Sequence, residues 1–130
     1  MRTILVDAID AFVIKTENGF EIFEPMRKML DEFPNRKIIL TGANDEQFKK
    51  FGLDKMPYEV FTLKHDPEKT NPEYYKKMLK HFDLTSADVV YFEHNLEAIK
   101  SAQSVGILTY SWDNEKRPLR ELGIFLEHTT

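Results

Sequence analysis

Four side chains capable of chemistry follow apolar runs of strand length or stand just before a predicted helix. They are Asp7, Thr41 and Glu93, which come directly after residues 3–6, 37–40 and 89–92, and Lys69, which precedes Thr70-Asn71-Pro72. The carboxyl ends of neighbouring parallel strands share one edge of a sheet, so we expect these positions to converge on a single site. A carboxylate, a hydroxyl, an ammonium group and a second acid in one crevice suit phosphoryl chemistry on a metal ion.

Each of these residues also has an ordinary structural explanation. Asp7 could be a helix N-cap or a solvated loop acid. Thr41 could be a simple strand-end hydroxyl, although the following Gly42 would let backbone N–H groups cradle an anion. Lys69 opposes the dipole of the helix that follows it, which favours a role in neutralising a phosphate or a carboxylate. His94 stands at a strand end, where a lone histidine is more often a hydrogen-bonded structural residue than a catalyst.

The composition is that of one globular domain. The chain has 130 residues, of which 42% are hydrophobic and 31% charged. A domain over residues 1–130 can therefore bury a sizeable core without disulfides or metal staples. The net charge of −4 comes without a basic stripe, so nucleic acid is not an expected partner.

Cysteine usage and hydropathy bear on the compartment. The sequence contains no cysteine, which excludes thiol catalysis and Cys-ligated metal sites and fits a reducing cytosol. The apolar run after Met1-Arg2 ends at Asp7, far short of a secretory signal core. No apolar stretch approaches the ~20 residues that span a bilayer. We therefore expect a cytoplasmic protein without membrane association.

Apolar runs of strand length alternate with stretches of helical period, which predicts βαβ units and a parallel sheet. The predicted strands cover residues 3–7, 37–41, 58–63, 89–92 and 107–110. An Asn18-Gly19 turn predicts a separate hairpin between residues 12–14 and 20–22. Asn44, Asn95 and either Thr70 or Asn71 are the predicted helix N-caps. The expected fold is a doubly wound, Rossmann-like α/β fold of about five strands, built as a three-layer α/β/α sandwich.

In their order and spacing, these motifs resemble those of the haloacid dehalogenase-like (HAD) hydrolase superfamily. The family pattern is an apolar strand ending in Asp-x-Asp-x-Thr, a strand ending in Thr or Ser, a Lys before a helix, and a strand followed by acids. At the corresponding places the chain has residues 4–11, 38–41, 69–72 and 90–95. The predicted hairpin also falls where this superfamily places its squiggle and flap beside the active site.

The resemblance implies a role for each matching residue. Asp7 would be the nucleophile and a Mg²⁺ ligand. Thr41 would hydrogen-bond the phosphoryl group, and Lys69 would neutralise charge on the nucleophile and the substrate. Glu93 would hold the metal. Ile9 stands where the family has its second acid, so its backbone carbonyl can still bind the metal but its side chain cannot protonate the leaving group.

The chain departs from the family pattern at further positions. Ala11 replaces the threonine of the first motif, and Glu93-His94 replace the usual aspartates, which weakens the predicted metal site. Asp10 could replace the missing acid only if a bulge shifts the register, because strand alternation otherwise points it elsewhere. Losing a general acid typically costs ~10²–10⁴-fold in rate.

The gaps between the first and second strands, and between Thr41 and Lys69, are too short for the cap domain that many members of the superfamily carry. We therefore expect one capless core domain over residues 1–130, open to a phosphorylated small molecule or macromolecule or closed by another subunit of a homo-oligomer. Three functions stay open. They are a Mg²⁺-dependent phosphohydrolase with an impaired acid step, a catalytically inactive binding or interaction module and, ranked third, a dehalogenase-like displacement at carbon by Asp7.

Overall fold

A computed structural model describes all residues from 1 to 130. The main sheet has five parallel strands in the order β5-β4-β1-β6-β7. Its strands are β1 (Thr3–Asp7), β4 (Lys37–Thr41), β5 (Glu59–Thr62), β6 (Val89–Glu93) and β7 (Leu108–Ser111), while β2 (Val13–Thr16) and β3 (Gly19–Ile22) form a separate antiparallel hairpin. The chain builds outward from β1 to β4 and β5, then returns to the other side of β1, so the strand order reverses beside β1. Such a reversal opens a crevice at the carboxyl ends of the strands.

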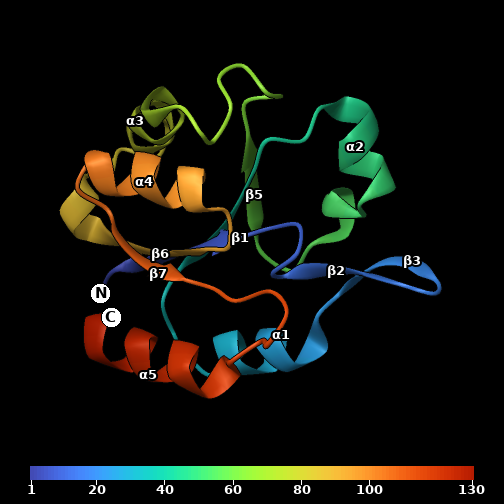
Figure 1. Cartoon of the computed structure of the whole chain (residues 1–130). Helices are drawn as coiled ribbons and strands as arrows, with labels where there is room; N and C mark the ends of the chain where they lie inside the picture. The colour runs from blue at the N-terminus through green and yellow to red at the C-terminus, as the bar shows by residue number, and fades with distance from the viewer.

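Helices cover both faces of this sheet. They are α1 (Glu24–Asp31), α2 (Asp45–Lys50), α3 (Pro72–His81), α4 (Leu96–Ser104) and α5 (Leu119–Thr129), with short 3₁₀ turns at Leu53–Lys55 and Ser86–Asp88. Figure 1 shows α3 and α4 on one face and α1 and α5 on the other, with the β2–β3 hairpin projecting from the side. The predicted three-layer α/β/α fold is confirmed. None of these helices is both long and apolar enough to traverse a membrane.

The central strand β1 is buried on both faces, which explains its uninterrupted apolar sequence. Ile4 and Val6 pack into the core beneath α1 and α5, whereas Leu5 points into the core beneath α3 and α4. The strand therefore ties both helical layers to one rigid element. Asp7 is its last residue, so its position is fixed by packing on either side.

Local signals place the ends of the helices as predicted. The Asn44 side chain accepts a hydrogen bond from the backbone N–H of Gln47, and the Gln47 side chain accepts one from the backbone N–H of Asn44. This reciprocal pair is a capping box. Asn71, and not Thr70, caps α3, and Asn95 caps α4. Several strand boundaries differ from the prediction, as at β5 and β7, and the difference at β6 bears on the site, because β6 extends through Glu93, which pairs with β7 and is buried.

Candidate active site

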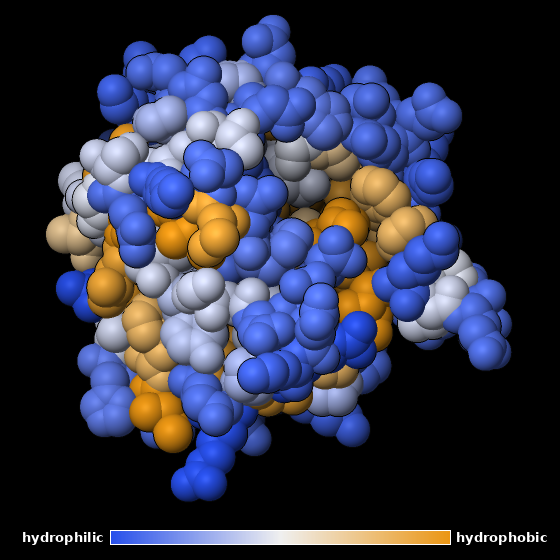
Figure 2. All heavy atoms as spheres, viewed as in Figure 1, coloured by the Kyte–Doolittle hydropathy of each residue, from blue (hydrophilic) through white to orange (hydrophobic).

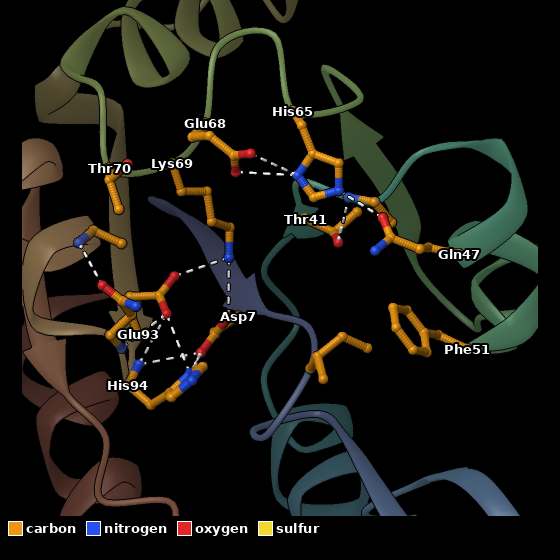
Figure 3. A pocket seen from close by; sticks show the side chains of 15 residues that line it. Asp7, Thr41, Gln47, Phe51, His65, Glu68, Lys69, Thr70, Glu93 and His94 are labelled. Atoms are coloured by element: carbon orange, nitrogen blue, oxygen red, sulfur yellow. Dashed lines mark hydrogen bonds and ion pairs between the residues drawn. The ribbon is translucent and has the colours of Figure 1, made fainter.

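The crevice at the carboxyl edge of the sheet is a cavity of about 290 Å³. Asp7, Thr41 and Glu93 are the last residues of their strands, and Lys69 lies in the loop before α3. All four line this cavity, as does His94, and Figure 3 shows them converging from separate elements. The structure thus brings together the residues that the sequence pattern predicted to meet.

Two buried acids and two cations form a single cluster in the cavity. The Lys69 ammonium lies 2.9 Å from Asp7 Oδ1 and 2.8 Å from Glu93 Oε1. On the opposite oxygen of Asp7, Nδ1 of His94 lies 2.5 Å from Oδ2. The side chains of Asp7 and Glu93 are only 2% and 1% exposed. Such acids need partners, and here two positive charges balance two negative ones.

Glu93 is fully engaged by protein donors. Its Oε1 accepts from Lys69 and from the hydroxyl of Tyr91, and its Oε2 accepts the backbone N–H groups of His94 and Asn95, both at 3.1 Å. A carboxylate offers about four acceptor positions. Glu93 therefore acts in this arrangement as the anchor of Lys69.

The cluster shifts the protonation equilibria of its members. Burial raises the pKa of Asp7, and Glu93 adds to this, whereas Lys69 and His94 favour its ionised form. Burial would raise the pKa of Glu93 too, but Lys69 and hydrogen bonding from His94 lower it below its usual range. Burial alone would lower the pKa of Lys69, but the two carboxylates raise it well above its usual value. Hydrogen bonds to Asp7 and Glu93 raise the pKa of His94 to about 10. Both cations therefore stay charged at neutral pH.

Three of these groups are candidate ligands for a magnesium ion. One ligand atom from each of Asp7, Glu93 and His94 lies within 4.8 Å of the others. This set includes an imidazole nitrogen, whereas Mg²⁺ prefers oxygen ligands. The acceptor positions of Glu93 are taken, and the His94 ring is bound to Asp7. The donor set does not fit Mg²⁺ without separating these pairs.

Thr41 and Gly42 form the turn that closes one side of the cavity. The Thr41 hydroxyl oxygen accepts a hydrogen bond from the backbone N–H of Ala43. The backbone carbonyl of Thr41 accepts one from the hydroxyl of Tyr74 at 2.7 Å. A Cβ atom on Gly42 would lie 3.2 Å from the His65 ring. Glycine at this position therefore allows the imidazole to pack directly beside the predicted phosphate-binding residue.

An apolar residue, Ile9, lines the cavity at the position where the family pattern has its second acid. Ile9 lines the cavity together with Phe51, whereas Asp10 is absent from its wall. Asp10 has a left-handed backbone (φ 69°), and its side chain is half exposed, with Oδ2 3.8 Å from Nε2 of His94. The space-filling view shows a hollow between α2 and α4 with apolar surface beside it (Figure 2).

Three further residues that line the cavity are not among the site residues predicted from the sequence. They are His65, Glu68 and Gln47, which form a hydrogen-bonded group at the cavity wall. One signal could have indicated His65: it comes three residues after β5, whose carboxyl end lies at the same sheet edge.

The comparisons with known proteins agree with this architecture. No protein-family model matches the sequence, and no curated protein matches it. Among solved structures, a HAD family enzyme of Bacteroides thetaiotaomicron, solved with magnesium and inorganic phosphate, has a TM-score of 0.68 at 11% identity, with 88% of this chain and 95% of that chain covered. A subfamily IA HAD hydrolase of Geobacter sulfurreducens has a TM-score of 0.65 at 13% identity, covering 86% and 89%. A HAD-superfamily hydrolase of Ehrlichia chaffeensis has a TM-score of 0.64 at 15% identity, with 88% of this chain and 62% of that chain covered.

These likenesses span most of the chain at low sequence identity, so they bear on its architecture. They agree with the parallel five-stranded sheet and its flanking helices. The resemblance suggested by the sequence is confirmed at the level of the fold: this chain has the fold of the HAD-superfamily hydrolases.

Proposed function

We propose that the protein hydrolyses a phosphorylated substrate through a covalent intermediate on Asp7. The observation that carries this proposal is the buried Lys69 ammonium, which bridges Asp7 and Glu93 at 2.9 and 2.8 Å on the cavity wall beside Thr41. Burying three charged groups is costly for stability alone. Clusters of buried charged groups are characteristic of active sites, where charge develops or moves during the reaction.

In the proposed mechanism, a carboxylate oxygen of Asp7 attacks phosphorus, and the bond to the leaving group breaks. Water then attacks the aspartyl-phosphate, releasing inorganic phosphate and restoring the carboxylate. Lys69 counters the negative charge on the phosphoryl oxygens. The hydroxyl of Thr41 provides a hydrogen bond to one of them.

We further propose that Lys69 and His94 supply the positive charge in this site. Magnesium is what the family resemblance predicts, and the Bacteroides structure was solved with it. In this chain, however, the imidazole of His94 already lies against one oxygen of Asp7. The proposed mechanism therefore uses these two cations in place of a magnesium ion.

The substrate would reach an open site. Between β1 and β4 the chain forms only the β2–β3 hairpin and α1, and between β4 and Lys69 only α2, a 3₁₀ turn and β5. We propose that no cap domain closes over Asp7. Either a phosphorylated small molecule or a phosphorylated group on a macromolecule could then enter, with a second subunit as an alternative means of closure.

Phosphoryl transfer from acetyl phosphate tests the proposal directly. The protein should gain the mass of one phosphoryl group, and peptide mapping should place it on Asp7. The Asp7→Asn variant should gain none, while Asp54→Asn, at an exposed position in a 3₁₀ turn, should label like the wild type. Labelling at another residue, or in Asp7→Asn, would refute the nucleophile.

A second candidate is a binding module without turnover. It is favoured by Ile9 on the cavity wall and by a cluster whose charges already balance. This alternative predicts calorimetric binding of inorganic phosphate to the cavity, with no labelling of Asp7 by acetyl phosphate.

A further inference from the structure

His65 shares a cavity with the residues of the proposed phosphoryl site. Its ring lines the cavity and packs against Gly42, which directly follows Thr41. In Figure 3 it stands on the side of the cavity formed by Thr41 and Gln47, away from Glu93 and His94. The imidazole is thus separate from the four-charge cluster but shares its cavity.

Both ring nitrogens of His65 face hydrogen-bond acceptors. Nδ1 lies 3.0 Å from Oε1 of Glu68, and Nε2 lies 2.5 Å from Oε1 of Gln47. The same Gln47 oxygen accepts the backbone N–H of Asn44 at 3.0 Å, which establishes that the amide presents oxygen, not nitrogen, to the ring. A carboxylate and an amide oxygen can only accept. Both contacts are therefore satisfied when each ring nitrogen carries a proton.

The backbone is bent to place this ring. Lys64 and His65 both have left-handed conformations, with φ of 53° and 65°. Such conformations are unfavourable for residues other than glycine, and they concentrate at functional sites. Bonds from outside the turn hold it, because the Lys64 N–H donates to Thr62 Oγ1 and its ammonium pairs with Asp45, both at 3.0 Å.

The reaction lacks a proton donor at the position that the family pattern assigns to it. Ile9 and Phe51 have no acidic proton, and Asp10 does not line the cavity. We propose that His65, oriented by Glu68 and Gln47, is the general acid that protonates the leaving group in place of the residue lost at Ile9. This inference rests on the proposed hydrolase function.

The proton balance is complete without any further reactant. As the Asp7 oxygen bonds to phosphorus and the ester P–O bond breaks, the Nε2 proton of His65 leaves its hydrogen bond with Gln47 and passes to the departing oxygen, and the leaving group departs as an alcohol. Neutral His65 then accepts a proton from the water that attacks the aspartyl-phosphate. Cleavage of the bond between Asp7 and phosphorus releases phosphate and returns both residues to their starting states.

The dependence of rate on the leaving group tests this role. p-Nitrophenyl phosphate has a good leaving group that needs little protonation, whereas an alkyl phosphate such as glycerol phosphate needs a proton. In His65→Gln, kcat/KM for the alkyl ester should fall by ~10²–10⁴-fold, but by less than about tenfold for the aryl ester. Glu68→Gln should show the same selectivity with a smaller loss. His128→Gln, which alters a histidine outside the cavity, is the matched control.

The alternatives give distinct results. Equal losses on both esters in His65→Gln would give His65 a positioning role only and would overturn the proposal. No loss on either ester would also overturn it. Selective loss in Asp10→Asn instead would assign the acid to Asp10. If the folded wild type hydrolyses neither ester and is not labelled by acetyl phosphate, the hydrolase function fails, and the role of His65 with it. Labelling without turnover of either ester would overturn His65 alone.

Discussion

Nδ1 of His94 lies 2.5 Å from one oxygen of Asp7, while the Lys69 ammonium holds the other oxygen at 2.9 Å. The proposed nucleophile is therefore held by cations on both sides, and Glu93 completes a neutral group. Because these side chains are largely buried, each charge depends on its partners. This interdependence leads to measurable consequences for stability, pH dependence and metal binding.

Removing the cation that bridges the acids should destabilise the protein. In Lys69→Met, Asp7 and Glu93 lose the ammonium that compensates their charge, so the free energy of unfolding should fall by about 3–5 kcal/mol. Urea denaturation measures this loss. The matched control is Lys100→Met, because Lys100 is exposed and pairs with Glu97 at 3.4 Å, and its loss should be at most about 1 kcal/mol. Equal effects in the two variants would mean that the cluster adds no stability.

The stability contributed by His94 should decline at alkaline pH. Hydrogen bonds to Asp7 and Glu93 raise the pKa of His94 from 6.5 to about 10 in the folded protein. A group whose pKa is raised by folding contributes its full stabilisation at pH values below its pKa in the unfolded chain. This stabilisation is lost as the pH rises through its pKa in the folded protein. In metal-free buffer, the difference in unfolding free energy between wild type and His94→Gln should shrink between pH 6.5 and 10. A constant difference across this window would show that His94 is not held as a cation.

Metal binding should depend on the residue at position 94. Calorimetry should detect little Mg²⁺ binding by the wild type, and EDTA should leave its turnover of p-nitrophenyl phosphate nearly intact. His94→Asp replaces the imidazole with an oxygen ligand beside Asp7, so it should gain Mg²⁺ binding. Abolition of wild-type turnover by EDTA, restored by Mg²⁺, would instead support the magnesium requirement that the family resemblance predicts.

The features that the sequence predicted well are local or follow from sheet geometry. The capping box at Asn44 and the cap at Asn95 depend on a few neighbouring residues, so their signals survive in the sequence. The meeting of Asp7, Thr41 and Glu93 follows from their shared place at strand ends in a parallel sheet.

Other parts of the site depend on contacts between distant residues. The residues around Glu93 in the sequence do not show that Tyr91 and Lys69 would both donate to one oxygen of Glu93. These bonds take up an oxygen that was predicted to bind a metal ion. Likewise, His65 reaches the cavity because Gly42, 23 positions earlier, leaves room for its ring. Loop conformation mattered too, since the left-handed backbone of Asp10 turns its side chain off the cavity wall.

The most direct test of Asp7 as nucleophile is the hydrolysis of p-nitrophenyl phosphate by the wild type and Asp7→Asn. This ester largely bypasses the general acid, so it isolates the attack on phosphorus. The wild type should turn this ester over, Asp7→Asn should not, and Asp54→Asn should match the wild type. Equal turnover by wild type and Asp7→Asn, both confirmed as folded, would contradict the role of Asp7 as nucleophile.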